Sequence, residues 1–586
     1  MRKIILSLLL LAACAPVLLV GNAQAGAKLW EKKLSGKILW KEFHPAGLML
    51  VITDKELLYA LDPKTGNEVY KIEDLSKNVL KPNDEAGTPT ILAGTPYFLI
   101  ATKAGMIKPE ILKLVNAADG KIIWEASYTV PPGQAEAITG GKKYDSQLVV
   151  VPQMISKVVF DPAHDQIIIT SLGGYVKTAD NRKIVKKSDM MFVGIDIKTG
   201  NTNFVYPSDE TFNGSTVIDS DVLISGDVGV VDWNGMRTFS VIDGKELGVV
   251  KMKRMMKAGL IGGLPYTKTN APSVIEGDTV YITVKEHIEA YNINTGAKKW
   301  ESEDLDVVVP QLLIAGDKLV GKMGGVFCTG YSWKTKVQCK EFRPYGIVVL
   351  DKNTGKVLAM TSKLDKQNGK AITSSLAIDN NIVYHAVSNG ARAFDLTTLT
   401  YKWMTSISKK AEDGDDPKLV QLDDGKMLML NTQVTAAFNA ADGKLLWSQV
   451  VPPVEMDLAM KMVMAFASVA AYASGVEAGK NGSINNQQQT IDRWSSTDAQ
   501  FSNMMKQISI ADKKGRYNYS MTGKSKNALI MGVNTKTGKL DRGCQVEGRV
   551  PDYLVDQVSG ILMNVSKSDP KWLMAYDMGE PLPKMD

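Results

Sequence analysis

The sequence predicts an all-β fold, a single closed β-propeller of four-stranded blades that carries a helical hairpin insertion. Three observations lead to this prediction. A short turn frame recurs along the chain, its most regular copies lie 44 residues apart, and the chain begins and ends with incomplete units that complete each other. A period of this length, with four short strands in each unit, is typical of propeller blades rather than of helical solenoids.

The frame is a strand ending in Asp or Asn, a turn closed by glycine, and a strand with an aromatic residue eight positions after the Asp or Asn. The clearest copy runs from Asn292 through Gly296 to Trp300. Five further copies have the same aromatic spacing, although Leu399 replaces the glycine in one, and they begin at Asp62, Asn116, Asp196, Asp395 and Asn439. Glycine supplies the positive φ of a short hairpin, and an Asp or Asn side chain can hydrogen-bond the turn backbone.

Each frame closes a unit of short predicted strands. The first unit is expected to hold Ile38–His44, Leu48–Thr53, Leu57–Leu61 and Glu68–Ile72. The seventh is expected to hold Ile372–Ile378, Ile382–Val387, Ala391–Leu396 and Tyr401–Thr405. Alternation and the share of β-branched and aromatic residues favour strands over helices. The count of units, weak copies included, reaches ten, with anchors at Asp62, Asn116, Asp196, Asp243, Asn292, Asp351, Asp395, Asn439, Asn534 and Asp577.

The two ends of the chain predict how the ring closes. Leu573–Asp577 reads as a third strand with no fourth strand after it, and Lys28–Lys32 reads as a fourth strand with no third before it. Pairing the two would complete one blade and hide two strand edges that an open sheet would have to protect.

The N-terminus predicts export. Arg2-Lys3 precede an apolar run, and Ala23-Gln24-Ala25 has the small-x-small pattern of signal cleavage, which gives a signal peptide at 1–25 and a mature propeller at 26–586. Leu11–Cys14 is the alternative, a lipoprotein box that would anchor Cys14 in the outer membrane. The apolar run continues past Cys14, which favours ordinary cleavage and a periplasmic or secreted protein. The net charge of +6 over 586 residues is too mild to predict nucleic-acid binding.

Cysteine use fits an oxidising compartment. Cys328 and Cys339 are separated by ten residues, which makes them a candidate disulfide spanning a hairpin. Cys544 is then left over and is expected to be a small buried residue. No Cys-x-x-Cys occurs, so structural zinc and covalent haem are not predicted.

The frame resembles the tryptophan-docking motif of the pyrroloquinoline-quinone-like propeller superfamily, A-x-D-x-x-T-G-x-x-x-W. Ala290–Trp300 matches it with Asn for Asp, and Ala60–Tyr70 matches it with Tyr for Trp. The repeat type is similar to that of the propeller lipoprotein of the outer-membrane barrel-assembly machinery, which is shorter. The resemblance implies a propeller, usually of seven or eight blades, against up to ten by repeat count.

The resemblance also implies structural roles for the frame residues. Five tryptophans at equivalent places are expected to pack between adjacent blades rather than to stack on a ligand, namely Trp30, Trp124, Trp300, Trp403 and Trp447. The matching turn glycines are Gly66, Gly120, Gly200, Gly296 and Gly443.

Quinone-dependent dehydrogenases share this motif, so an enzyme is the alternative. The resemblance implies that they hold the quinone between a Trp and a ring of two adjacent cysteines, with Ca²⁺ beside it. This chain has no adjacent cysteine pair and no segment onto which those residues can be carried. Its four histidines, His44, His164, His287 and His385, show no ligand spacing. No catalytic residue, metal ligand or cofactor is therefore predicted, and pyrroloquinoline quinone with Ca²⁺ remains the alternative.

The regular spacing fails at insertions. Two helices are expected within 451–509, the first at Met456–Ser474, which is rich in Ala and Met. Asp457 and Lys461 interrupt its apolar run, so it is too short to span a bilayer. It could pack on the propeller, bind a partner or touch a membrane surface. Lys177–Lys187 is a basic loop, and Lys251–Lys257 is basic and Met-rich. The residues predicted for a partner surface are Met456, Met460, Met464, Phe466, Lys251 and Arg254.

These observations favour a non-catalytic scaffold in the bacterial cell envelope that binds protein partners through loops or the helical insertion. The mature chain is expected to have no transmembrane span, although it could be peripheral to a membrane. The alternatives are a quinone-dependent dehydrogenase and a propeller that binds a small ligand or polysaccharide in its central channel. Function is not implied by fold alone.

Overall fold

The computed structural model describes the repeat region of the chain, with gaps. The described residues are 24–44, 46–75, 89–92, 95–102, 111–152, 155–180, 183–208, 217–218, 222–232, 235–251, 256–261, 264–269, 273–329, 338–364, 373–407, 418–421, 425–430, 434–450, 517–522, 528–547, 552–556 and 560–578. The helical insertion predicted at 451–509, Cys14 and nearly all of the predicted signal peptide lie outside these residues.

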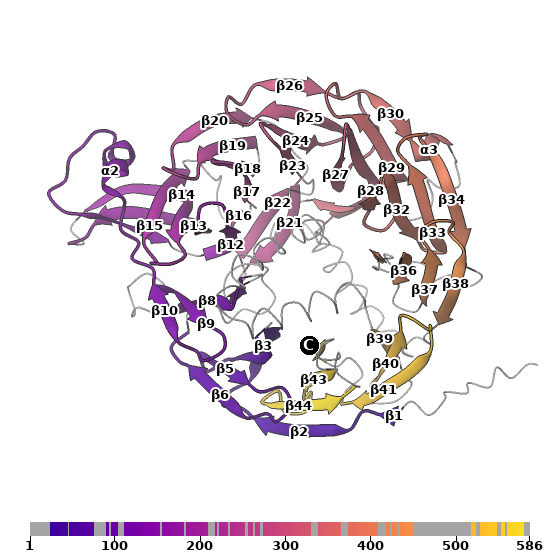
Figure 1. Ribbon diagram of the computed structural model, residues 1–586. Helices are drawn as coiled ribbons and strands as arrows, with labels where there is room; N and C mark the ends of the chain where they lie inside the picture. Colours follow the sequence, from indigo (N-terminus) through magenta and orange to yellow (C-terminus); the bar gives the residue numbers. More distant parts are fainter. Residues whose placement is uncertain are drawn as a thin grey trace, which may run out of the picture.

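Ten sheets of four or five strands follow one another in sequence order around a circle (Figure 1), and we number them sheet 1 to sheet 10. Sheet 1 contains β3 (Ile38–His44), β4 (Leu48–Thr53), β5 (Leu57–Leu61) and β6 (Glu68–Ile72). Sheet 2 contains β7 (Thr90–Ile91), β8 (Tyr97–Thr102), β9 (Ile111–Asn116) and β10 (Ile122–Glu125). Sheet 3 contains β11 (Leu148–Pro152), β12 (Ile155–Asp161), β13 (Gln166–Thr178), β14 (Ile184–Asp196) and β15 (Thr202–Ser208).

The next four sheets continue the pattern with strands in sequence order. Sheet 4 contains β17 (Val222–Ser225), β18 (Val228–Asp232), β19 (Gly235–Ser240) and β20 (Glu246–Lys251), and sheet 5 contains β23 (Ser273–Glu276), β24 (Thr279–Val284), β25 (His287–Asn292) and β26 (Lys298–Glu301). Sheet 6 contains β27 (Gln311–Ala315), β28 (Lys318–Thr329), β29 (Gln338–Asp351) and β30 (Val357–Met360), and sheet 7 contains β31 (Ala377–Asp379), β32 (Ile382–Val387), β33 (Gly390–Asp395) and β34 (Thr400–Ser406).

The last two sheets each take a fourth strand from the start of the chain. Sheet 8 is regular, with β35 (Lys418–Gln421), β36 (Lys426–Leu430), β37 (Val434–Asn439) and β38 (Leu445–Val450). Sheet 9 joins β39 (Tyr517–Thr522), β40 (Ala528–Asn534) and β41 (Leu540–Val546) to β1 (Gln24–Ala25), and sheet 10 joins β42 (Asp552–Asp556), β43 (Ile561–Val565) and β44 (Trp572–Asp577) to β2 (Lys28–Lys33). Strand β1 is the end of the predicted signal peptide, so cleavage after Ala25 would remove it and leave β2.

Two elaborations depart from the four-stranded plan. In sheet 3, β13 pairs with β12 through one half and with β11 through the other, and Figure 1 shows this sheet reaching outside the circle beside helix α2 (Pro132–Thr139). A separate three-stranded sheet joins β16 (Val217–Ile218), which precedes sheet 4, to β21 (Met256–Ile261) and β22 (Leu264–Thr269), which lie between sheets 4 and 5 in the chain. A short helix, α3 (Thr361–Leu364), follows sheet 6.

The core lies between the sheets. Every residue of β4 is buried, although a strand with one solvated face would alternate. Leu50 and Ile52 share a cluster with Phe98 of sheet 2, whereas Met49 and Val51 pack against the sheet 10 residues, including Met563. Sheet 1 is thus covered on both faces, by sheet 2 on one side and by sheet 10 on the other.

The predicted anchors occupy one structural position. Seven of the ten lie at or directly after the end of the third strand of a sheet, Asp196 ends the fourth strand of sheet 3, and Asn534 ends β40 in sheet 9. Asp62 is representative, since its carboxylate accepts hydrogen bonds from the backbone N–H groups of Lys64 (2.8 Å) and Thr65 (2.9 Å). The anchor predicted at Asp243 is wrong. Ser240 holds that position, because its carbonyl accepts from Gly244 N–H and its hydroxyl from Asp243 N–H.

Candidate functional site

Each frame tryptophan lies against the turn glycine of the following sheet. Trp30 in β2 contacts Gly66, where a Cβ would lie 2.6 Å from the indole, and φ at this glycine is +71°. The indole N–H donates to the carbonyl of Pro63 at 2.9 Å, the residue directly after the Asp62 anchor. A side chain larger than hydrogen at position 66 would both strain the turn and displace the ring.

The other predicted frame residues lie in equivalent positions. Trp124 donates to Ile197, Trp300 to Lys352 and Trp403 to Ala440, at 2.7–3.0 Å, and in each case the acceptor directly follows an anchor. Gly200 faces Trp124, Gly443 faces Trp403, and Gly120 faces Tyr70, whose hydroxyl donates to Ala117. Trp447 faces Gly538, and Trp300 faces Gly355. Neither of these glycines was among the predicted site residues, although both end a Thr-Gly pair at the right distance.

Some junctions are made by residues of another kind. Gly296 meets Val250 and Gly248 of sheet 4 rather than an aromatic ring. Between sheets 9 and 10, Arg542 replaces the tryptophan and donates to the carbonyl of Met578 at 2.7 Å, while its guanidinium lies 4.8 Å from the Tyr517 ring centroid. A cation over an aromatic face supplies part of the packing that an indole supplies elsewhere.

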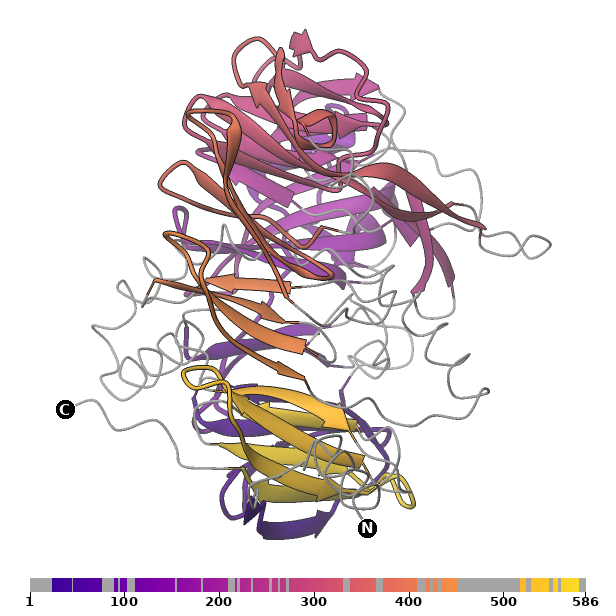
Figure 2. The same ribbon diagram turned by 90° about the vertical axis from the view of Figure 1, so that its right-hand side faces the viewer.

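The predicted partner-surface residues fall mainly outside the described part of the chain. Lys251 is the last residue of β20 and is exposed, whereas Arg254, Met456, Met460, Met464 and Phe466 lie outside the described residues. The hairpin that follows Lys251, β21–β22, contacts the long β28–β29 hairpin of sheet 6. Figure 2 shows both projecting from the same side of the circle of sheets. We call β16, β21, β22 and the β28–β29 hairpin the projecting group.

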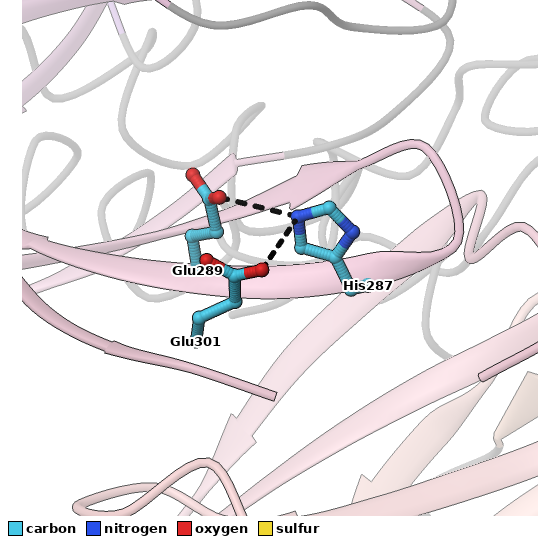
Figure 3. Close-up of side chains that lie close together, drawn as sticks. All are labelled: His287, Glu289 and Glu301. Carbon is cyan, nitrogen blue, oxygen red and sulfur yellow. Dashed lines mark hydrogen bonds and ion pairs between the residues drawn. The ribbon is translucent and has the colours of Figure 1, made fainter. Parts of the chain in front are cut away.

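A cluster of ionisable side chains lies on β25 and β26 (Figure 3). His287 Nε2 lies 3.1 Å from Glu289 and 3.6 Å from Glu301. One nitrogen or oxygen atom of each of the three side chains lies within 4.8 Å of the others, a spacing that could hold a metal ion. Glu289 is buried and also accepts from Tyr291 and, at 2.8 Å, from Lys298. No spacing rule predicts this group, because Glu301 joins it only through the pairing of β25 with β26.

The two carboxylates of the cluster already share an ammonium group. Lys298 Nζ lies 2.8 Å from Glu289 and 2.7 Å from Glu301, so an ammonium group already occupies the space between the two carboxylates. A metal ion could bind His287, Glu289 and Glu301 only by displacing Lys298. Burial raises the pKa of Glu289, but hydrogen bonds from His287, Lys298 and Tyr291 outweigh it and hold the pKa at about 2.

This network predicts an acid-dependent part of the stability. The pKa of Glu289 lies below the ordinary value of about 4.3, so its contribution is complete above that pH and is lost as the pH falls toward 2. Glu289→Gln is expected to lower the free energy of unfolding by about 1–3 kcal/mol at pH 7 and by less at pH 3. Urea denaturation at both pH values measures the difference. Glu301→Gln is the control, since its side chain is 49% exposed and a change below about 1 kcal/mol is expected.

Of the remaining three histidines, one is hydrogen-bonded between two sheets and two are buried in the core. His164 bridges sheets 3 and 4, with Nδ1 2.7 Å from buried Asp161 and Nε2 3.1 Å from Asp227. Burial opposes protonation there, but the two carboxylates prevail and raise the pKa of His164. His44 and His385 are buried, and burial lowers the pKa of His385 to about 3, so both are neutral core residues at pH 7.

The two cysteines of the candidate disulfide stand opposite each other in the β28–β29 ladder. Directly opposed residues of antiparallel strands have Cα atoms about 4.5–5.5 Å apart, within the range of a disulfide. Cys544 is buried, and burial raises the pKa of its thiol to about 12.

Alkylation of the denatured, unreduced protein is expected to label Cys544 but not Cys328 or Cys339, and prior reduction is expected to expose all three thiols. Labelling of Cys328 before reduction would contradict the pairing.

Comparisons with known proteins address the repeat. A family model described as outer membrane protein assembly factor BamB matches residues 16–163, 108–328 and 263–412, which together exceed half of the chain. No curated protein matches the sequence. No helix among the described residues is long and apolar enough to cross a membrane.

Solved structures similar to this chain are distant from it. BamB from Moraxella catarrhalis is 12% identical with a TM-score of 0.31, over 73% of this chain and 95% of that chain. The computationally designed protein Ika8 is 12% identical with a TM-score of 0.34, over 73% and 100% of the two chains. The dihydro-heme d1 dehydrogenase NirN in complex with DHE is 10% identical with a TM-score of 0.31, over 72% and 78%. Similarity at this level does not extend to what these proteins bind.

Proposed function

The chain belongs to the family of the outer membrane protein assembly factor BamB, and from this membership we propose an exported, non-catalytic scaffold that binds other proteins of the bacterial cell envelope. The signal-like N-terminus supports a periplasmic or secreted location. The described cluster of His287, Glu289 and Glu301 supports a structural role, because Lys298 already forms ion pairs with both carboxylates.

In this proposal the scaffold is one closed propeller of ten blades. Support for this proposal comes from side-chain contacts that link successive sheets and from a final contact that links sheet 10 to sheet 1. Arg542 connects sheet 9 to sheet 10, and Trp30 of sheet 10 then donates to Pro63 of sheet 1. Strand β2 pairs with β44 in antiparallel register, so that Glu31 stands opposite Met574. A closed ring hides strand edges and provides a rigid platform.

The partner surface is proposed to be the projecting group. The observation that supports it is that the β21–β22 hairpin lies outside the repeat, contacts β28 and extends from the same side as the β28–β29 hairpin (Figure 2). The proposed ring consists of the ten larger sheets, so this three-stranded sheet is not needed to complete it. Binding residues are frequently carried on such segments, held by a rigid framework.

Site-directed photo-crosslinking in intact cells tests this assignment. A photo-reactive residue at Leu264 or Lys268 in β22 is expected to give discrete adducts with envelope proteins. The control is Val69 on β6, which is 47% exposed on the circumference and is expected to give none. Adducts at Val69 alone, or at none of these positions, would contradict the proposal.

A second variant separates binding from folding. Replacement of residues 256–269 by a short Gly-Ser linker is expected to abolish the adducts, measured from a probe at Lys251, while leaving thermal unfolding nearly unchanged. If the linker variant keeps the same adducts, the projecting group is not the docking surface.

A further inference from the structure

Sheet 3 carries a second projection, independent of the projecting group. Strands β13 and β14 have 13 residues each, more than twice the length of a strand such as β5 with 5 residues. The half of β13 from Gly174 to Thr178 pairs with β11 rather than with β12. We call residues 174–188 the lateral hairpin, which lies in the part of sheet 3 that Figure 1 shows outside the circle.

Positive charge is concentrated on the lateral hairpin. It contains Lys177, Arg182, Lys183, Lys186 and Lys187 against a single acidic residue, Asp180, in a chain whose net charge is only +6. Arg182 lies outside the described residues. Among the described residues, Lys177, Lys183 and Lys187 form no ion pair with a carboxylate.

The ammonium groups of two of these lysines lie over aromatic rings. The Lys177 ammonium lies 5.9 Å from the Tyr175 ring centroid, and Lys183 lies 5.2 Å from that of Tyr144, which follows α2. Cation–π contacts of this kind orient an ammonium group without neutralising its charge. The lysines are therefore positioned as well as unpaired.

An exposed aliphatic residue lies on the same face of the hairpin as Lys177 and Lys187. Ile184 is 49% exposed and stands opposite Lys177 in the β13–β14 register, while Lys187 stands opposite Tyr175. The reverse side is buried, since Val176 has no exposed surface and belongs to the core cluster of sheet 3. One face of the hairpin thus presents two lysines, a tyrosine and an isoleucine to solvent.

We propose that the lateral hairpin binds a membrane surface rich in anionic phospholipid. Lysines near such a surface are attracted by its negative potential, and aliphatic and aromatic side chains enter the headgroup region between the charges. An acidic protein would pair with the lysines but would leave Ile184 without a role, which favours lipid. The hairpin would then orient the propeller relative to a bilayer while other surfaces stay free.

Vesicle sedimentation of the full mature chain tests the proposal. The protein is expected to sediment with phosphatidylcholine vesicles that contain phosphatidylglycerol, not with phosphatidylcholine alone, and to be released by NaCl. Because each surface lysine contributes about fivefold, Lys177→Glu/Lys183→Glu/Lys187→Glu is expected to weaken binding by about 100-fold or more. Ile184→Ser is expected to weaken it several-fold with an unchanged salt dependence.

A matched triple variant controls for net charge. Lys402→Glu/Lys444→Glu/Lys539→Glu makes the same charge change at exposed sites on sheets 7 to 9, and binding is expected to fall much less. Equal losses in both triple variants, or no binding to anionic vesicles, would overturn the proposal. So would binding to soluble polyglutamate as tight as to vesicles and insensitive to Ile184→Ser, since that would indicate an acidic protein. Circular dichroism confirms that each variant is folded, and the photo-crosslinking of β22 is unaffected by either outcome.

Discussion

Trp124→Ala is expected to lower the free energy of unfolding by about 3–5 kcal/mol, the usual cost of truncating a large buried aromatic residue. The Trp124 side chain is 7% exposed, packs against Gly200 and donates to the carbonyl of Ile197 at 2.7 Å. Removing it opens a cavity between sheets 2 and 3 and leaves that carbonyl without its donor. Urea denaturation followed by circular dichroism measures the loss.

The neighbouring residue provides the control. Ile123 is on the same strand but is 39% exposed, so Ile123→Ala is expected to change the free energy of unfolding by less than about 0.5–1 kcal/mol. Gly200→Ala probes the other side of the contact, because φ there is +74° and an added Cβ would lie 2.9 Å from the Trp124 ring. If Trp124→Ala and Ile123→Ala were equally mild, the tryptophan would not hold the two sheets together.

Much of the fold could be predicted because the repeated frame is local. An anchor, its turn and its aromatic residue span nine positions, and each copy satisfies its own backbone through the anchor side chain, as Asp62 does. The four strands predicted for the first unit are β3 to β6 with the same bounds. Repetition also identified the tryptophans as members of one class, so their packing between adjacent blades could be anticipated without any long-range information.

The frame was hardest to recognise where a residue of another type occupies the anchor position or the aromatic position. Ser240 replaces the anchor Asp, because a hydroxyl can also accept from the turn backbone. Arg542 replaces the aromatic residue, because its guanidinium both donates to the following sheet and stacks on Tyr517. In each case the geometry is retained while the residue type differs, and a search by residue type alone misses it.

The candidate site residues that escaped prediction depend on contacts between distant segments. His164 meets Asp227 across 63 positions, and no spacing pattern connects them. Glu289 and Glu301 come together through strand register rather than through periodicity. The projecting group depends on β21 reaching β28, a contact between a strand outside the repeat and a long strand of sheet 6. Such arrangements follow from how the sheets are placed, which the repeat does not encode.

Removal of β2 is expected to have the largest effect of any change considered. Deleting residues 26–33 takes Trp30 away from Gly66 and leaves the edge of β44 without its partner. Loss of the indole alone costs about 3–5 kcal/mol, and with the strand pairing the total approaches the 5–15 kcal/mol stability of a typical domain. The truncated chain is therefore expected to unfold or to aggregate through its exposed edge, measured by circular dichroism and size-exclusion chromatography.

A cross-link tests ring closure in a protein that stays folded. Lys33 stands opposite Trp572 in the β2–β44 pair, so Lys33→Cys/Trp572→Cys is expected to form a disulfide on oxidation, identified by mass spectrometry of the joined peptides. Because the cross-link would span nearly the whole chain, it is expected to stabilise the protein by about 6 kcal/mol in the loop-entropy model. Lys33→Cys/Leu446→Cys places the second thiol on sheet 8 and is expected to give no cross-link. If the first pair also fails to join in the folded protein, the two ends do not meet, and the propeller is open.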